Sequence, residues 1–279
     1  MALLKYTFKN DTLFKMLFVQ YRDLLKRLVC ELLSIRLENI GQFEVRNPEI
    51  PPDSIGEKFC RLDINMTVNG QKINLEIQVE NEGDFPERSL YLWARAFLSA
   101  LATGRDYKEL PRTIFISIIA FKLFDCLDFH SEFQPLEVTR HAPLTDRMSL
   151  HFFELPKLPA ILDKNDELRL WLALFKAETE EELQQIKALE VPIMEQAIEA
   201  YRSITVAPEF QELERLRSKA RHDEASALRK AREEAREEAR EEEKFVFARK
   251  LIKDGVSFEK ISEYTGLTQE EIETICSVD

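Results

Sequence analysis

The feature that most constrains the fold of this chain is a pair of alternating segments on either side of Asn69-Gly70. Residues 59–79 read FCRLDINMTVNGQKINLEIQV, with apolar and polar residues alternating through both halves. An Asn-Gly dipeptide between two such runs is the strongest short-range signal for a β-hairpin with a type I′ turn. A two-residue turn also fixes the register, so Val68 should face Gln71 and Asp63 should face Glu76.

The two faces of this hairpin differ in polarity. Period-2 alternation gives one apolar face that should pack on a core, made of Cys60, Leu62, Ile64, Met66, Val68, Ile73, Leu75, Ile77 and Val79. The other face is polar and contains Arg61, Asp63, Asn65, Thr67, Lys72, Asn74, Glu76 and Gln78. In this register, Arg61 is opposite Gln78, and the Cβ atoms of Asp63 and Glu76 lie roughly 4.5–5.5 Å apart.

Two carboxylates opposed across a sheet destabilise it unless their charge is compensated. A divalent cation would compensate it, since magnesium commonly uses one or two protein carboxylates and completes its shell with water and substrate phosphate. A solvent-exposed polar face, with Arg61 neutralising Asp63 on the diagonal, explains the same residues without a metal. The pattern alone leaves both interpretations open.

Helical patterns flank the hairpin. Apolar residues at three-to-four spacing predict a helix over residues 9–35, capped by Asn10 or Asp11. Pro86 opens a second predicted helix that runs to about Thr103 and stops at Gly104. Its expected apolar side is formed by Leu90, Trp93, Phe97 and Leu101.

Further strands follow the second helix. Residues 113–120, TIFISIIA, predict a strand buried on both faces, and residues 133–140 and 147–155 predict two more, ended by Pro156 and Pro159. The order hairpin, helix, strand implies a mixed sheet with helices packed on it. We expect an α/β or α+β domain over residues 1–160.

Several classes of protein are excluded by composition. The seven glycines form neither a dinucleotide-binding fingerprint nor a phosphate-binding P-loop. The four cysteines and four histidines lack the spacing of a zinc site. The N-terminal residues have charges where a signal peptide would be apolar, and no run of 18 apolar residues occurs, so we expect a cytoplasmic protein without a membrane segment.

Charge is unevenly distributed along the chain, whose net charge is −12. Residues 1–160 carry 20 basic and 22 acidic side chains, whereas residues 161–279 carry 19 and 29. A local basic groove is therefore compatible with the first part, and the acidic remainder is a poor candidate for contacting DNA.

The second part of the chain is helical in pattern. Residues 161–211 form a helical extension, and residues 212–244 contain the repeat AREEAREEAREEE, which predicts a solvated spacer helix or a weak self-association helix. Residues 245–279 predict three short helices with stops at Gly255 and Gly266 and caps at Ser257 and Thr268. This outline matches a helix-turn-helix, but acidic residues in its last helix favour a protein-binding or oligomerisation module.

Several short sequence motifs in the first part of the chain together resemble those of a known family. The string Asp63-x12-Glu76-x-Gln78, preceded by KNDTLFKMLF and followed by Arg88, TIFISIIA and HFFELPKL, resembles the PD-(D/E)XK nuclease family transposases, also called the recombination-promoting nuclease (Rpn) family. The resemblance covers residues 5 to about 160, and the last residues are similar to the tails of many members. It implies a restriction-endonuclease-like mixed sheet flanked by helices, followed by an all-helical tail. It also implies hydrolysis of phosphodiester bonds in double-stranded DNA, with Mg²⁺ or with Mn²⁺ or Ca²⁺ in its place, in bacterial mobile-element or recombination contexts.

The same resemblance implies roles for individual residues. Asp63 and Glu76 take the metal-ligand positions, with the Ile77 backbone carbonyl as a third ligand. Gln78, which would position the attacking water, occupies the place where the wider superfamily has lysine. Glutamine has no positive charge to stabilise the phosphate, so that charge must come from elsewhere. The candidates for it are Lys72, Arg61 and Arg88.

Two further residues have alternative interpretations. Asp11 is either a helix cap or an acidic residue directed at the metal, with Lys15 one turn further on. Arg88 either clamps a phosphate or is an exposed side chain near Glu87 and Asp84. The rival functions are a non-catalytic DNA-binding or regulatory protein that keeps the fold, and an assembly protein that forms homo-oligomers through its helical tail.

Overall fold

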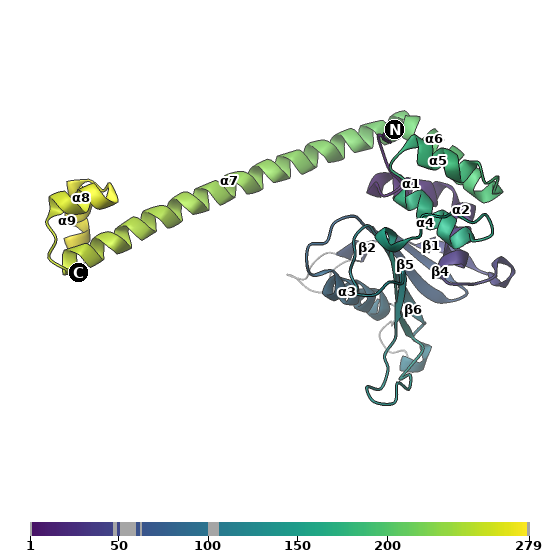
Figure 1. Ribbon diagram of the computed structural model, residues 1–279. Helices are drawn as coiled ribbons and strands as arrows, with labels where there is room; N and C mark the ends of the chain where they lie inside the picture. The colour runs from purple at the N-terminus through teal and green to yellow at the C-terminus, as the bar shows by residue number, and fades with distance from the viewer. Residues whose placement is uncertain (1, 47–48, 51–59, 62, 100–105, 278–279) are drawn as a thin grey trace. The chain divides into compact units, whose positions relative to one another are not determined.

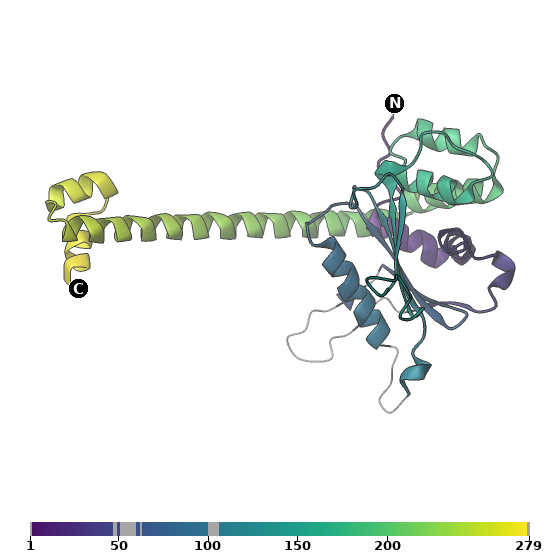
Figure 2. The same ribbon diagram turned by 60° about the horizontal axis from the view of Figure 1, so that its bottom comes forward.

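The computed structural model describes residues 2–46, 49–50, 60–61, 63–99 and 106–277 (Figure 1). The chain divides into two compact units, Met1–Gln211 and Glu212–Asp279. The candidate residues for catalysis all lie in the first unit, which is built around a mixed β-sheet with helices on both faces (Figure 2).

The described residues of the first unit form a six-stranded sheet with the order β1-β4-β5-β6-β8-β7. Strands β5, β6 and β8 are parallel to one another, and the other neighbours pair antiparallel. The bounds are Phe43–Arg46 for β1, Ile64–Val68 for β4, Gln71–Gln78 for β5, Thr113–Ile119 for β6, His130–Phe133 for β7 and Met148–Glu154 for β8. Two short strands, β2 (Glu49–Ile50) and β3 (Cys60–Arg61), pair separately. The predicted fold class, a mixed sheet flanked by helices with a helical C-terminal region, is confirmed.

The hairpin has the predicted register from Val68↔Gln71 to Ile64↔Leu75. Both turn residues have positive φ, 49° at Asn69 and 78° at Gly70, as a type I′ turn requires. Beyond Ile64 the prediction is wrong, because Arg61 pairs with Glu49 of β2 and not with Gln78. The expected core face packs in the main core from Ile64 to Ile77, while Val79 is exposed after the end of β5 and Cys60 and Leu62 are outside the described side chains.

The polar face of β5 is not open to solvent, which contradicts the solvent-exposed interpretation. Asn74 is buried, and Glu76 is only 6% exposed. The cause is the position of β5 inside the sheet, because β6 lies beside it and helix α3 packs against both strands.

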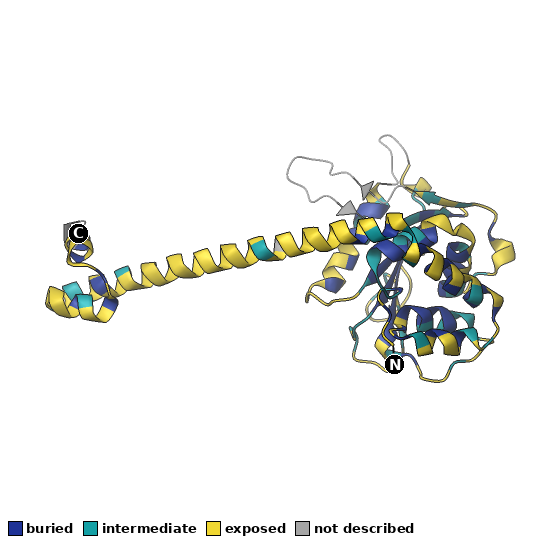
Figure 3. Cartoon of the chain, turned by 90° about the horizontal axis from the view of Figure 1, so that it is seen from above, coloured by how far each residue is buried: buried dark blue, intermediate teal, exposed yellow. Residues whose placement is uncertain are grey.

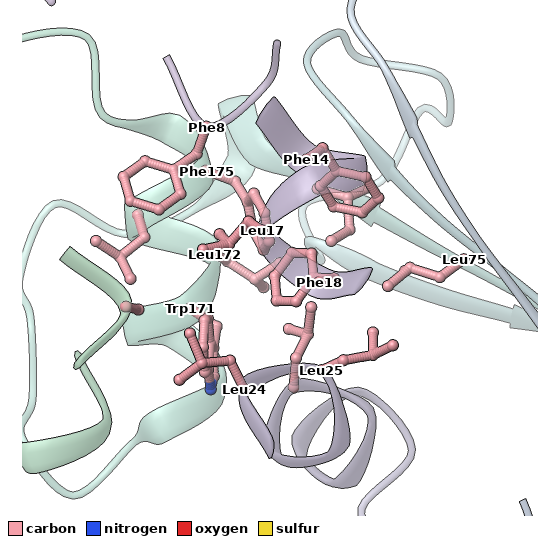
Figure 4. Packing of buried hydrophobic residues seen from close by; sticks show 14 of the residues in the cluster. Phe8, Phe14, Leu17, Phe18, Leu24, Leu25, Leu75, Trp171, Leu172 and Phe175 are labelled. Atoms are coloured by element: carbon pink, nitrogen blue, oxygen red, sulfur yellow. The ribbon is translucent and has the colours of Figure 1, made fainter. Parts of the chain in front are cut away.

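The larger core lies on one face of the sheet, under five helices. These are α1 (Asp11–Gln20), α2 (Arg22–Leu32), α4 (Glu167–Lys176), α5 (Glu180–Lys187) and α6 (Pro192–Val206). The rings of Phe14 and Phe18 on α1 meet Phe175 and Trp171 on α4 (Figure 4). The single helix predicted over residues 9–35 is divided into α1 and α2, because the backbone leaves the helical region at Tyr21.

Helix α3 (Phe85–Leu98) covers the opposite face of the sheet. Its predicted apolar side is wrong in part, since Leu90 is 47% exposed and Phe97 is only partly buried, whereas Trp93 packs against the cluster on this face and its Nε1 donates to the backbone O of Thr113 on β6. The side that packs on the sheet contains Phe85, Ser89, Leu92 and Ala96. Leu101, Thr103 and Gly104, the predicted end of this helix, lie outside the described residues.

The later strands match the predictions only in part. Strands β6 and β8 lie where the sequence predicts them. The strand predicted over residues 133–140 is wrong, because β7 ends at Phe133 and the chain continues as a loop that contains Pro135 and Pro143 and one bridge between Leu136 and Pro143. Proline cannot donate to a strand ladder, which explains the early end. Short 3-10 helices η1, η2 and η3 occupy Leu37–Asn39, Tyr107–Glu109 and Leu155–Lys157.

The second unit contains most of helix α7 (Pro208–Lys253), followed by α8 (Phe258–Thr265) and α9 (Gln269–Ser277). The AREE repeat lies in α7 and is exposed (Figure 3). A small apolar cluster joins the end of α7 to α8 and α9 through Ala248, Ile261, Leu267, Ile272 and Ile275. Thr268 and Glu271 exchange the hydrogen bonds of a capping box, and Gly255 and Gly266 have positive φ. Within the described ranges, no helix has the length and apolar character needed to cross a membrane.

Candidate active site

The two carboxylates singled out by the sequence meet at the C-terminal end of β5. The backbone N–H of Asp63 donates to Glu76 Oε1 over 2.8 Å, and the backbone N–H of Ile77 donates to Asp63 Oδ2 over 3.0 Å. Asp63 directly precedes β4, so these side-chain bonds continue the hairpin where its backbone ladder ends. Each carboxylate is thus held by the backbone of the other strand.

Helix α1 brings two more charged groups to this point. Lys15 Nζ lies 2.9 Å from Asp63 Oδ1 and 2.6 Å from Asp11 Oδ1. Asn10 is the residue that caps the helix, with its Oδ1 accepting from the backbone N–H of Leu13. The carboxylate of Asp11 therefore contacts Lys15 and does not serve as the N-cap.

Burial and mutual repulsion make this a costly place for negative charge. Burial raises the pKa of Glu76 well above its ordinary value, and the neighbouring Asp63 raises it further, against the opposing charges of Lys15 and Arg88. Burial also raises the pKa of Asp63, although Lys15 and the N–H of Ile77 favour its ionised form. Burial disfavours the charged form of Lys15, but Asp63 and Asp11 together outweigh it and raise the pKa of this ammonium group. The site therefore favours binding of additional positive charge.

The donor atoms fit a hard divalent cation. Carboxylate and carbonyl oxygens are the ligands that magnesium prefers, and it usually keeps several waters. Within the described residues, no three His, Cys, Asp or Glu side chains come together as a metal site. A cation would therefore use Asp63 and Glu76 together with a backbone carbonyl and water. Since the N–H of Ile77 is directed at Asp63, its C=O faces the same edge of the extended strand.

Two buried polar atoms flank Glu76 on its face of the sheet. Ser117 lies beside Glu76 in the parallel register, and Asn74 is two residues earlier on β5. In the described part of the chain, neither Ser117 Oγ nor Asn74 Nδ2 has a hydrogen-bond partner. Buried polar atoms of this kind are usually satisfied by ordered water, which suits an ion with a partial water shell.

Gln78 and Arg88 both lie near the carboxylates. Gln78 is two residues after Glu76 on β5, and its Nε2 donates to the backbone O of Glu80. Arg88 lies in the first turns of α3, close enough for its charge to act on Glu76. The structure therefore brings together Asp11, Asp63, Glu76, Gln78 and Arg88.

Lys72, by contrast, is directed away from this group. Its Nζ donates to Ala96 O and Ser99 Oγ at the C-terminal end of α3. It is four residues from Glu76, about 13 Å along an extended strand, and burial lowers the pKa of its ammonium group. The side chain of Arg61 lies outside the described part of the chain, so that candidate stays a prediction.

Sequence reasoning missed two features of this sheet edge. The i,i+4 spacing of Asp11 and Lys15 indicates their ion pair, but no local pattern indicates the contact between Lys15 and Asp63. The other feature is a buried ion pair at the end of β8, where Lys157 Nζ lies 2.6 Å from Glu154 Oε2. Its only sequence signal is the i,i+3 spacing within HFFELPKL.

The histidines form a separate group on β7 and β8. His151 Nδ1 lies 3.1 Å from His130 Nε2, and its Nε2 lies 2.8 Å from Ser149 Oγ. His141 is an exposed loop residue with a positive φ. None of these contacts involves Asp63 or Glu76.

Comparisons with known proteins give one match. No curated protein matches this chain, and no solved structure does. The model of a family described as PD-(D/E)XK nuclease family transposase matches residues 8–231, from just before α1 to the first residue of the AREE repeat in α7. Because this match spans most of the chain and includes both carboxylates, the chain belongs to the PD-(D/E)XK nuclease family transposases, a family of nuclease-type hydrolases associated with mobile elements.

Proposed function

We propose that this protein is a magnesium-dependent endonuclease that hydrolyses phosphodiester bonds in double-stranded DNA at the Asp63–Glu76 site. The observation that carries the proposal is the reciprocal pair of hydrogen bonds that fixes the buried carboxylate of Glu76 beside the partly buried carboxylate of Asp63, with their charge only partly compensated. Strongly perturbed carboxylates at the C-terminal ends of parallel strands are typical of functional sites. Family membership supports the choice of DNA as the substrate.

In this proposal Asp63, Glu76 and the Ile77 carbonyl hold the metal ion. Bound there, the ion would polarise the scissile phosphate and lower the pKa of a water molecule. The protein keeps the two carboxylates in place through the backbone N–H groups of Asp63 and Ile77.

The neighbouring residues act on the water and the phosphate. Gln78 follows Glu76 on the same face of β5, where its amide can orient the attacking water. Arg88, on the α3 side of Glu76, can contact a phosphate oxygen through its guanidinium group. Asp11 holds Lys15 at the edge of the site through the 2.6 Å ion pair.

The test compares the purified chain with Asp63→Asn on supercoiled plasmid in Mg²⁺, in Mn²⁺, in Ca²⁺ and in EDTA. Asparagine can still accept from the Ile77 N–H, so the variant should fold while losing cleavage. Asp125→Asn, an exposed substitution outside the site, is the matched control. We expect metal-dependent nicking by the wild type and the control, and none by Asp63→Asn.

Two results would contradict the proposal. If Asp63→Asn nicks the plasmid at the wild-type rate, cleavage does not take place at the Asp63–Glu76 site. Folded wild-type protein that shifts the plasmid in a binding assay, but does not cut it in any metal, would favour the non-catalytic DNA-binding alternative. Homo-oligomerisation through α7 to α9 stays a prediction, which the molar mass of the chain with and without residues 212–279 would test.

A further inference from the structure

The site needs a protein cation that β5 does not provide. Phosphodiester hydrolysis increases negative charge on the phosphate oxygens in the transition state, and fixed positive groups directed at them accelerate the reaction. Gln78 is neutral and its amide donates to the Glu80 carbonyl. Lys72 is engaged at the end of α3. The charge must therefore come from another element, either from Arg88 on α3, whose charge acts on Glu76, or from helix α1.

Lys15 is the ammonium group that contacts the carboxylate pair within the described residues. Its Nζ lies 2.9 Å from Asp63 Oδ1, while the other oxygen of Asp63 accepts from the Ile77 N–H. The side chain is 22% exposed, so it is held by neighbours yet remains accessible from solvent. A phosphate placed next to the carboxylates would meet this ammonium group.

Helix α1 gives Lys15 a rigid base. The neighbouring residues Leu13, Phe14, Leu17 and Phe18 are all fully buried in the main core. Groups placed on packed helices hold catalytic geometry better than groups on loops. The Asp11 carboxylate, at 2.6 Å, fixes the direction of the lysine side chain from the same helix.

The contacts of Lys15 also leave one of its N–H donors for a substrate. An ammonium group has three N–H donors, and the ion pairs with Asp11 and Asp63 use two of them. The three carboxylates of Asp11, Asp63 and Glu76 outnumber the two charges of Lys15 and Arg88, so the group without a metal ion keeps a net negative charge when all three are ionised.

We infer that Lys15 is a further catalytic residue, which contacts the scissile phosphate and supplies the positive charge that Gln78 lacks. Asp11 is a positioning residue that acts through Lys15. This inference rests on the proposed function, because it assigns a role within that same site.

The experiment measures plasmid cleavage by the full chain in Mg²⁺ for four variants. Lys15→Met keeps the side-chain length without the charge, and Lys15→Arg keeps the charge. The double variant Lys15→Met with Gln78→Lys moves the charge onto β5, on the same face as Glu76. Lys122→Met, an exposed lysine elsewhere, is the matched control.

We expect Lys15→Met to lower kcat by about 10²-fold or more, the usual effect of removing one transition-state stabilising group. KM for plasmid should change little, Mn²⁺ binding measured by calorimetry should persist, and Lys15→Arg and the double variant should recover part of kcat. A purely structural role for Lys15 predicts loss of folding or of Mn²⁺ binding and no recovery by the lysine at position 78.

Three other outcomes would contradict the inference about Lys15. If the wild type cuts and Lys15→Met cuts within about threefold of it, below what one stabilising group contributes, the inference is wrong and the proposed function stands. If Lys15→Met is unfolded or no longer binds Mn²⁺, and Lys15→Arg and the double variant are equally inactive, Lys15 is structural. If the wild type cuts under no condition, the proposed function and the inference fail together.

Discussion

Two buried glutamates lie at the same edge of the sheet, and their surroundings differ. Glu76 is near the end of β5 and Glu154 is at the end of β8, with β6 between them. The parallel register aligns Gln78 with Ile119 and Ile119 with Glu154, so the two strands end at the same level. The two positions therefore share burial and place in the fold, and differ in how their charge is balanced.

The charge of Glu154 is fully balanced. The side chain is buried, with 1% exposure, and its Oε1 accepts from the Leu123 N–H over 2.7 Å. Its Oε2 lies 2.6 Å from Lys157 Nζ, which also donates to the backbone O of Phe124. This ion pair fastens residues 123–124 to the end of β8, which is a structural role.

The charge of Glu76 is not balanced in this way. Its Oε1 accepts one backbone N–H, and the charged group that acts on its pKa most strongly is another carboxylate, that of Asp63. The lysine present pairs with Asp63 and Asp11 and not directly with Glu76. Glu76, the glutamate of the proposed site, is therefore the one whose local charges do not cancel, which leaves room for a cation or a substrate to complete them.

The largest effect on stability should come from Glu154→Gln. The amide would leave the buried Lys157 ammonium without a charged partner, and breaking such a pair costs about 3 kcal/mol or more. We expect a correspondingly lower free energy of unfolding of the first unit in urea. Glu132→Gln on β7 would not serve as the control, because Glu132 also accepts from Ser149.

A better control for that prediction is Glu44→Gln on β1, whose carboxylate forms an exposed ion pair with Arg46. Exposed pairs contribute about 0–1 kcal/mol, so this variant should remain close to the wild type. If Glu154→Gln and Glu44→Gln have the same free energy of unfolding, the charge of Glu154 contributes no more to stability than a surface charge does. The contrast between Glu154 and Glu76 would then be wrong.

The sequence predicted much of the Glu76 site because its determinants are local. Asn69-Gly70 fixes the register of the hairpin, and strand alternation then places Asp63 next to Glu76. The contact of Lys15 with Asp63 depends on where α1 packs against the sheet, and no spacing within either segment contains that information.

The errors have the same origin. Arg61 was expected opposite Gln78, but it pairs with Glu49 of β2, a partner that the Asn69-Gly70 turn does not determine. The apolar side of α3 was centred on Leu90, which is exposed, whereas Phe85, Ser89 and Leu92 are buried and Trp93 is partly buried against the sheet. Periodicity identifies a helix, but which of its sides is buried depends on the neighbouring surface.

Whereas Glu154→Gln should lower the stability of the protein, the corresponding substitution at Glu76 should raise it. Glu76→Gln keeps an oxygen that accepts from the Asp63 N–H and removes a buried charge that faces another carboxylate. The variant should be more stable than the wild type at pH 8 by on the order of 1 kcal/mol, or about 2–4 °C in Tm for a unit of this size. Calorimetry on both proteins without added metal measures this, and cleavage should be lost in the same variant. A lower Tm for Glu76→Gln would show that its charge is already balanced, as that of Glu154 is.

The smallest effect concerns His151, a third buried titratable group on the same sheet. Burial lowers the pKa of His151 to about 4, and the charge of Glu132 only partly opposes this. The unfolded chain takes up a proton near pH 6.5 while the folded chain does not, so stability should fall as the pH is lowered from about 6.5 to about 4. The difference between pH 7.5 and pH 5 should be on the order of 1 kcal/mol, smaller than the full shift implies because the ring retains some access to solvent.

His151→Gln should lose less stability over this range than the wild type, and His222→Gln on the exposed surface of α7 should behave as the wild type does. An identical loss in His151→Gln would mean that the proton is taken up elsewhere, and the contrast would then be limited to the two glutamates.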